Sequence, residues 1–457
     1  MRKPKRPWQG VWALAPLLSL GCLSGVSKEV PLERWSPASH EQIEARLAGD
    51  RSPELTVLLA FSGGGTRAAS FSYGVLQELA ATEVATSKGT RSLLDEVDAV
   101  SSVSGGSFAS AYFGLKGKGI LDDFEERFLR KNIEGAMIRQ LFIPTNWLKL
   151  LHKNYARSDL AAEYYGRQIF DDASFADLNR PGAPLILINT TEIGSGLRFP
   201  FFRGHFDMLC IDLDKYPVAR AVAASSAVPG LLSPLTLESH AGTCGYQPSP
   251  HLVELANEKG RKSIEGLEAH SLLKLASSEK RTWLHLVDGG IADNLGLRAY
   301  YSGVSLYGGI DEAIKELEHS GPHHVLLILV NSITLKTPEF AHQGRVPGLK
   351  ETLGRVSGIE LARYDVDTVQ LVRDSFEKWT KEASTAERPI SFDFVDVNFE
   401  AMADEDERAK LNDIGTNFHL PDEDVDLLLS AARKILGEAP AFQAFLERVG
   451  GATGSAP

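Results

Sequence analysis

Short apolar segments that each end in glycines or other small residues recur along the chain, and they restrict the fold more than any other feature. Five of them fall at 55–61, 93–103, 183–193, 282–287 and 323–332, and helical spacing of apolar residues follows several of them. Strands that alternate with helices favour a largely parallel sheet covered on both faces. The sequence therefore predicts a three-layer α/β/α fold in which ligands bind beyond the carboxyl ends of the strands, at the glycine-rich turns.

The rest of the chain extends this core. A long helical pattern covers 358–379, a strand-like segment covers 390–399, and an amphipathic helix covers 422–436. No linker separates these segments from the sheet, so we expect one domain over 53–450 that includes the C-terminal helical region. The polar segment 233–281 is either an insertion that carries a lid or a plain surface excursion.

The N-terminus has the pattern of an export signal. A basic start, "MRKPKR", precedes the apolar "VWALAPLLSLG", which is too short for a comfortable transmembrane helix, and Cys22 follows directly. The arrangement resembles a bacterial lipoprotein signal with Cys22 as the lipidated residue, although Ser19 stands where such signals usually carry an aliphatic residue. A plain secretory signal with an incidental cysteine and a buried apolar start are the alternatives.

On the lipoprotein interpretation, residues 1–22 are the signal and residues 23–52 are a polar tether. Stable attachment to a membrane needs several acyl chains at Cys22. Leu23 is not the aspartate that often retains such proteins at the inner membrane. We therefore expect an exported protein at the outer membrane or cell surface, with periplasmic and secreted locations as alternatives.

Charge and cysteine content exclude some partners. The chain carries 48 Lys and Arg residues against 60 Asp and Glu residues, a net charge of −12, which argues against a nucleic-acid partner and against a general attraction to anionic membranes. Cys210 and Cys244 either pair in an oxidising compartment or are two buried thiols. Neither belongs to a recognised metal-ligand pattern, so we expect no metal site.

Three glycine-centred turns follow apolar strands and carry the candidate chemistry. In "FSGGGTRAA", the amides of Gly63, Gly64 and Gly65 can converge on a negative centre at the start of a helix. A nucleotide P-loop would need Gly-Lys-Ser/Thr, whereas Thr66 and Arg67 follow here. The alternative is a strand–helix turn that simply needs positive φ.

The other two turns hold a serine and an aspartate. In "SVSGG", Ser104 has Gly106 two places later and Ser102 two places earlier, a degenerate form of the G-x-S-x-G pattern that lifts a nucleophilic hydroxyl clear of a sheet. The alternative role of Ser104 is a helix N-cap. In "LHLVDGGIADNLG", Asp288 ends a strand before Gly289 and Gly290, which is by itself an ordinary turn.

The ordered combination of "GGGTR", "SVSGG" and "DGG" resembles the patatin-like phospholipase family. The stretches "INTTEIGSGLRFPF" and "ARAVAASSAVPGLLSPL" agree, and the resemblance runs from about Leu55 to Ser332 and more loosely through the C-terminal helices. It implies a Ser–Asp dyad without histidine, with Ser104 as nucleophile and Asp288 as base. It also implies no cofactor and a phospholipid, lysophospholipid or other acyl-ester lipid as substrate.

A carboxylate is a weak base for a hydroxyl, so such a dyad needs a desolvated Asp288 and strong stabilisation of the oxyanion by Gly63, Gly64 and Gly65. Arg67 either meets a substrate phosphate or braces the glycine loop. Asn294 is expected to fix the loop that holds Asp288. The segment around Pro229 shapes an acyl pocket or simply packs in the core.

Two other classes of function remain open. An esterase with a Ser–Asp–His triad would need a late histidine, for which His419 is the candidate, and a non-catalytic surface-anchored lipid-binding protein would need no base. His285 lies three residues before Asp288, an offset that places it on the opposite face of a strand, so we interpret it as structural. The remaining histidines of the domain body show no motif; they include His205, His240, His323 and His324.

Overall fold

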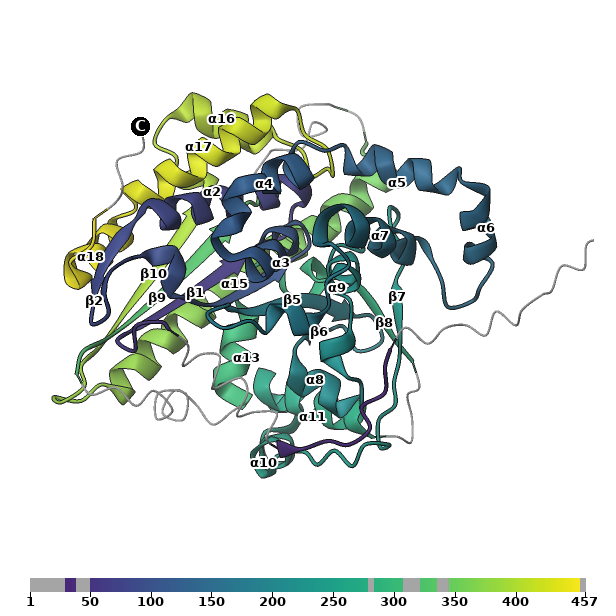
Figure 1. The fold of residues 1–457 in the computed structure, drawn as a ribbon, viewed down its shortest axis with the longest axis horizontal. Helices are drawn as coiled ribbons and strands as arrows, with labels where there is room; N and C mark the ends of the chain where they lie inside the picture. Colours follow the sequence, from purple (N-terminus) through teal and green to yellow (C-terminus); the bar gives the residue numbers. More distant parts are fainter. Residues whose placement is uncertain are drawn as a thin grey trace, which may run out of the picture.

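The computed structural model describes residues 29–37, 50–277, 283–306, 321–334, 344 and 346–452. Within these residues an eight-stranded sheet has the order β10-β9-β1-β4-β5-β8-β7, and β6 pairs with β5 outside this path (Figure 1). The strands are β1 (Leu55–Phe61), β4 (Val97–Val103), β5 (Leu185–Glu192), β6 (Leu197–Phe201), β7 (Leu235–Glu238), β8 (Trp283–Asp288), β9 (His323–Asn331) and β10 (Ile390–Asn398). A separate hairpin joins β2 (Glu83–Thr86) to β3 (Gly89–Ser92).

The sheet is parallel over most of its width and antiparallel at one end. Strands β10, β9, β1, β4 and β5 are parallel to one another. Strands β6 and β8 are antiparallel to β5, and β7 is antiparallel to β8. All five predicted strands are present, and the prediction of a largely parallel sheet is confirmed. The antiparallel end was not predicted, because periodicity reports how buried a strand is and not its direction.

Helices cover both faces of the sheet. On β1, Val57 and Phe61 belong to a large core shared with α2 (Gly65–Ala81), α3 (Gly105–Lys116), α9 (Val218–Ser225) and α17 (Asp422–Glu438). Ala60 points to the opposite face, where the core is shared with α13 (Arg298–Leu306) and α15 (Leu349–Ala383). This alternation along a buried strand produces the predicted three-layer architecture.

The other helices surround these layers. They are α4 (Ile120–Phe124), α5 (Ile133–Leu141), α6 (Pro144–Leu150), α7 (Arg157–Tyr165), α8 (Arg203–Met208), α10 (Pro250–Glu258), α11 (Ile264–Ala276), α12 (Gly290–Asp293), α16 (Glu405–Asp413) and α18 (Pro440–Val449). No helix in the described part of the chain is both long and apolar enough to cross a bilayer.

The described part of the segment 233–281 packs beside the main core, around a small core of its own. It supplies β7 to the sheet, and α10 and α11 pack with α8 around a small core of their own (Figure 1). That core comprises Met208, Leu252, Leu255, Ala256, Ala269, Leu272 and Leu306. Residues 278–281 lie outside the described residues.

Part of the predicted tether is attached to the domain. The Leu32 amide donates to the Cys210 carbonyl at 2.8 Å, and the Asp212 amide donates to the Val30 carbonyl at 2.8 Å. Glu29 forms a buried ion pair with Arg220 of α9. The expectation of a tether over 23–52 is therefore wrong for residues 29–35, while Cys22 and the whole signal over 1–22 lie outside the described residues.

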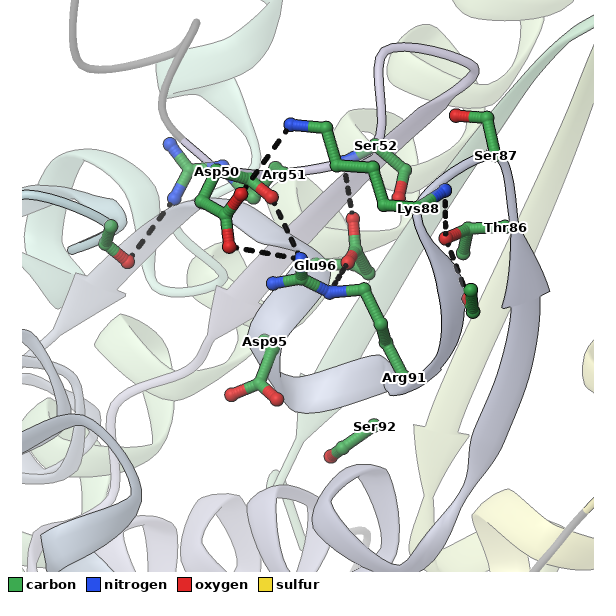
Figure 2. Close-up of polar contacts among 12 residues, drawn as sticks. Asp50, Arg51, Ser52, Thr86, Ser87, Lys88, Arg91, Ser92, Asp95 and Glu96 are labelled. Atoms are coloured by element: carbon green, nitrogen blue, oxygen red, sulfur yellow. Dashed lines mark hydrogen bonds and ion pairs between the residues drawn. The ribbon is translucent and has the colours of Figure 1, made fainter.

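A polar cluster holds the start of β1 to the start of β4 (Figure 2). The Ser52 amide donates to Glu96 at 2.6 Å, and the same carboxylate pairs with Arg91 at 2.6 Å. Nearby, Arg51 pairs with Asp98 at 2.9 Å, and burial raises the pKa of Asp98 to about 7 against the opposing effect of Arg51. These contacts set the register of the two strands that end in the glycine turn and the Ser104 turn.

Cys210 and Cys244 form a disulfide with their Cα atoms 5.5 Å apart and a sequence separation of 34. We expect the double substitution Cys210→Ser/Cys244→Ser to lower the free energy of unfolding by about 2–4 kcal/mol, because the cross-link closes a loop of this length. Urea unfolding followed by circular dichroism, with and without a reductant, measures the effect. The double variant should be insensitive to the reductant, and an unchanged midpoint for the parent protein under reduction would contradict the prediction.

Candidate active site

Ser104 lies on the sharp turn between β4 and α3. Its φ of 51° and ψ of −119° lie outside the conformations that side-chain-bearing residues usually adopt, and such strain is typical of a nucleophile turn. Ser102, which replaces the first glycine of the pattern, has its Oγ 2.5 Å from Ser110 Oγ in α3. The Ser110 hydroxyl thus provides a hydrogen-bond partner for the Ser102 hydroxyl, which a glycine at this position would not have.

The glycines after Ser104 allow two backbone segments to touch. A Cβ added at Gly105 would lie 1.9 Å from the Gly65 carbonyl oxygen, and a Cβ at Gly106 would lie 2.8 Å from the Ser62 carbonyl oxygen. Both distances are shorter than real Cβ contacts. The nucleophile turn and the "GGG" turn therefore pack backbone against backbone.

Ser104 donates a hydrogen bond to Asp288. The distance from Ser104 Oγ to Asp288 Oδ2 is 2.8 Å, and the exposed fractions of the two residues are only 4% and 7%. The Gly290 amide donates to the other carboxylate oxygen at 2.8 Å. Burial raises the pKa of Asp288 from 3.8 to about 6, and the hydrogen bonds from Gly290 and Ser104 oppose that rise.

Asp288 reaches Ser104 although β8 runs against β4 and β5. Only three residue pairs join β5 to β8, beginning with Thr190 and Asp288, and all lie at the carboxyl end of β5. The neighbouring Asn189 pairs with Val103, which directly precedes Ser104. This short overlap brings the carboxyl end of an antiparallel strand to the same edge as the carboxyl ends of the parallel strands.

The "GGG" turn offers two amides rather than the three that we expected. The Gly63 amide donates to the Asn294 carbonyl at 2.9 Å, so it is already occupied. The amides of Gly64 and Gly65 have no acceptor among the described residues. Their φ angles of 142° and 63° lie in the region that favours glycine, and they stand at the start of α2, where the helix dipole is positive.

Arg67 connects the start of α2 to the loop after α16. Its Nη1 donates to the Ile414 carbonyl at 2.8 Å, which lies outside the glycine loop, so bracing of that loop and contact with a substrate phosphate both stay predictions. It is 5% exposed, and no carboxylate of the described residues lies within ion-pair distance of it. Burial lowers its pKa to about 10, so Arg67 still carries a positive charge beside the turn at neutral pH.

Asn294 connects the two glycine-rich turns. An added Cβ would lie 2.5 Å from the Asn294 side-chain oxygen at Gly63 and 2.8 Å from it at Gly290. The Asn294 backbone carbonyl also accepts the Gly63 amide. This contact agrees with the expectation that Asn294 fixes the loop of Asp288. Asp365 of α15 lines the same cleft as Asn294, and burial raises the pKa of Asp365 to about 7 against the opposing effect of Asn294. Sequence reasoning missed Asp365 because nothing local marks it.

Ser225, at the end of α9, is a further residue that sequence reasoning missed. The Ser104 amide donates to Ser225 Oγ at 2.8 Å, and Ser225 in turn donates to the Asn189 carbonyl at 2.6 Å. Ser225 therefore holds the backbone of the strained turn in place. Consecutive serines in an otherwise alanine-rich buried helix were the available signal.

A cleft of about 1130 Å³ opens at Ser104 and Asp288. Val228 and Pro229 form part of its wall, as expected for the segment around Pro229. Helix α15 supplies much of the rest, through Ile359, Leu361, Ala362, Val366 and their neighbours. No described residue of 233–277 lines it, which favours the surface excursion over the lid as the interpretation of that segment.

The histidines do not join the pair. Among the described residues, none of those lining the cleft is a histidine. His285 is exposed and bonds Thr236 at 3.0 Å, and His419 is exposed. Burial lowers the pKa of His205 to about 3. It lines a separate apolar pocket of about 350 Å³ that contains neither Ser104 nor Asp288.

The described residues contain no cluster of three or more histidine, cysteine, aspartate or glutamate side chains that could hold a metal ion. A buried hydroxyl–carboxylate pair beside two unoccupied amides has the geometry of a serine-based acyl-transfer site. The sequence model of the patatin-like phospholipase family matches residues 59–301, more than half of the chain, and the chain belongs to this family.

Solved structures of human GIVD cytosolic phospholipase A2 are distantly similar to the chain. The structure with methyl gamma-linolenyl fluorophosphonate has 14% identity and a TM-score of 0.41, and the match covers 90% of this chain and 61% of that chain. A second structure of the same human protein has 14% identity and a TM-score of 0.35, with 70% and 56% covered. The chain thus spans less than two thirds of these human proteins. No curated protein matches it.

The contact between Gly105 and Gly65 can be tested directly. We expect Gly105→Ala to destabilise the protein by about 3 kcal/mol or more, because the added methyl group meets a backbone carbonyl that cannot move aside cheaply. Gly303→Ala in α13 is the matched control, since nothing lies within 4 Å of a Cβ there. Thermal unfolding of both variants measures the difference, and equal midpoints would show that the two turns are not in contact.

Proposed function

We propose that this chain is a lipid acyl hydrolase that cleaves fatty acyl esters through a Ser104–Asp288 dyad. Family membership supports hydrolysis of lipid esters in general. The observation that carries the assignment of the dyad is the 2.8 Å hydrogen bond between a strained serine and a buried carboxylate. Substrates of phospholipid, lysophospholipid or acylglycerol type, which combine a polar end with acyl chains, fit a cleft of about 1130 Å³ whose wall combines polar and apolar side chains.

Acylation begins when Ser104 Oγ attacks the ester carbonyl carbon and its proton passes to Asp288 Oδ2. The amides of Gly64 and Gly65 then donate to the oxyanion of the tetrahedral intermediate, and the positive end of α2 and the charge of Arg67 add to that stabilisation. When the intermediate collapses, Asp288 returns the proton to the leaving alcohol and an acyl-serine remains.

Deacylation repeats these steps with water. Asp288 takes a proton from the water molecule that attacks the acyl-serine, the same amides hold the second oxyanion, and the fatty acid leaves as Ser104 recovers its proton. Every group in this cycle belongs to the chain or to water, so we propose that hydrolysis needs no metal ion and persists in EDTA.

For the location, we propose an exported protein anchored through a lipid on Cys22.

Removing either member of the dyad should abolish hydrolysis. We expect Ser104→Ala and Asp288→Asn each to lower kcat/KM for a soluble p-nitrophenyl ester by about three or more orders of magnitude. A fluorophosphonate probe should label the parent protein and not Ser104→Ala. Circular dichroism of each variant establishes that it is folded.

His419→Ala is the control for the dyad. It should keep near-parental activity, because His419 is exposed and does not line the cleft. A loss of several orders of magnitude would favour a Ser–Asp–His triad. Folded parent protein that neither hydrolyses esters nor accepts the probe would instead indicate a lipid-binding protein without catalysis.

The pKa of Asp288 predicts the acid limb of the rate profile. Asp288 acts as a base only in its ionised form, which predominates above its pKa of about 6. We therefore expect kcat/KM on a soluble ester to be level above about pH 7 and to fall about tenfold per pH unit well below pH 6. Rates measured from pH 4.5 to pH 8 test this, and a limb at the ordinary aspartate value near 4 would contradict a desolvated base.

A further inference from the structure

Helices α5 and α6 expose an unusual concentration of large apolar side chains. The exposed fractions of Phe142, Trp147, Leu148 and Leu151 are 75%, 62%, 67% and 81%. Together with two half-exposed isoleucines they define what we call the α5–α6 apolar surface: Ile138, Phe142, Ile143, Trp147, Leu148 and Leu151. Exposed apolar residues are normally scattered singly over a protein surface. A group of six on two consecutive helices is therefore typical of an interaction site.

Packing in the domain does not account for these side chains. Helix α5 buries only Ile133 and Ala136, and α6 buries only Asn146. Trp147 Nε1 donates to the Leu141 carbonyl at 2.5 Å, and Asn146 Nδ2 donates to the Gln140 carbonyl at 2.8 Å. These bonds lie within the segment, whereas its large apolar side chains remain exposed.

Both ends of this segment are attached to loops at the cleft. The Ile133 amide donates to the Phe418 carbonyl at 3.2 Å, two residues from Thr416, which lines the cleft. At the other end, Arg157 donates to the Gly230 carbonyl at 3.1 Å, next to Pro229 in the cleft wall. Figure 1 shows α6 at the periphery of the molecule. The α5–α6 apolar surface therefore projects from the rim of the cleft.

The charge of the segment is opposite to that of the chain. Residues 131–157 contain five lysine or arginine residues and a single glutamate, within a chain of net charge −12. Lys131, Arg139 and Lys153 are exposed, and none of them lies within ion-pair distance of a carboxylate of the described residues. Apolar and aromatic side chains flanked by unpaired cations are typical of a surface that lies in the interface of an anionic bilayer.

We propose that the α5–α6 apolar surface docks the protein on an anionic lipid bilayer. The apolar side chains enter the interfacial region, the flanking cations meet lipid phosphates, and the cleft is brought to the source of its substrate. Delivery of substrate rests on the proposed function, whereas docking itself does not. A second copy of the chain is the competing occupant of the surface.

Docking is tested with protein that cannot hydrolyse or carry a lipid anchor. Full-length protein with Cys22→Ala and Ser104→Ala is sedimented with phosphatidylcholine vesicles that contain or lack phosphatidylglycerol. We expect binding to the anionic vesicles and about tenfold or more weaker binding after Trp147→Ser/Leu148→Ser. Ile264→Ser/Trp283→Ser is the matched control, because it removes the same kinds of exposed side chain from α11 and β8.

A second pair of substitutions tests the charge. Arg139→Gln/Lys153→Gln should weaken binding to the phosphatidylglycerol vesicles and remove their advantage over neutral ones. Equal binding by the parent and by Trp147→Ser/Leu148→Ser would overturn the proposal. So would a parent protein that binds no vesicles, or one that forms dimers that the same double variant dissociates.

The same variant separates docking from catalysis. In protein that retains Ser104, Trp147→Ser/Leu148→Ser should hydrolyse a soluble monomeric ester at the parental rate and lose activity only on vesicles. If the parent cleaves no ester at all, the proposed function fails while the vesicle result still decides docking. If the variant also loses activity on the soluble ester, the segment supports the fold of the cleft and the docking interpretation fails.

Discussion

A buried carboxylate is stable in a protein only where other groups replace its lost water, and around Asp288 those groups are few. One oxygen accepts the Ser104 hydroxyl and the other accepts the Gly290 amide. The rise of its pKa from 3.8 to about 6 corresponds to a cost on the order of 3 kcal/mol for the ionised native state. Because the native state holds the proton more tightly than the unfolded chain, this cost is absent in acid and grows as the pH rises from about 4 to about 6.

The same constraint explains why no cation among the described residues acts on Asp288. A cation next to Asp288 would lower its pKa and weaken it as a base, and no cation contributes to its shift. In the proposed mechanism, the positive potential at the oxyanion comes from the start of α2 and from Arg67. Neither Gly65 nor Gly105 has room for a side chain, because a Cβ on Gly105 would meet the Gly65 carbonyl and a Cβ on Gly65 would meet the Asn417 carbonyl.

Longer-range contacts hold this local arrangement. Ser225 and Asn294 each connect two segments far apart in sequence, one by accepting the Ser104 amide and the other by accepting the Gly63 amide. Helix α15 closes the cleft on one side, and the loops that border the cleft also anchor the ends of the α5–α6 segment. A surface that meets lipid and a pocket that receives it would thus share the same loops.

Much of this could be read from the sequence. Strands and glycine turns are local properties: apolar runs bury themselves, and only small residues allow a sharp turn after a strand. Ser104 and Asp288 were assigned through the resemblance of three ordered motifs to a family, because each of their turns is ordinary by itself. The C-terminal strand and helices were predicted for the same reason. The expected tether over residues 29–35 was wrong because a polar segment can still bind the domain through its backbone, as the Leu32 amide does at the Cys210 carbonyl.

Only the tertiary structure showed the direction of each strand and which distant residues contact one another. Periodicity does not reveal that β8 is antiparallel, yet the three-residue overlap with β5 is what carries Asp288 to Ser104. Periodicity also does not reveal that the Asn294 carbonyl accepts the Gly63 amide, or that Asp365 and Ser225 lie at the site. The sequence by itself determined which residues can do chemistry, because that depends on residue type and neighbours. Only the folded chain decided which of them meet, because a hydrogen bond between residues 184 positions apart depends on strand order and register.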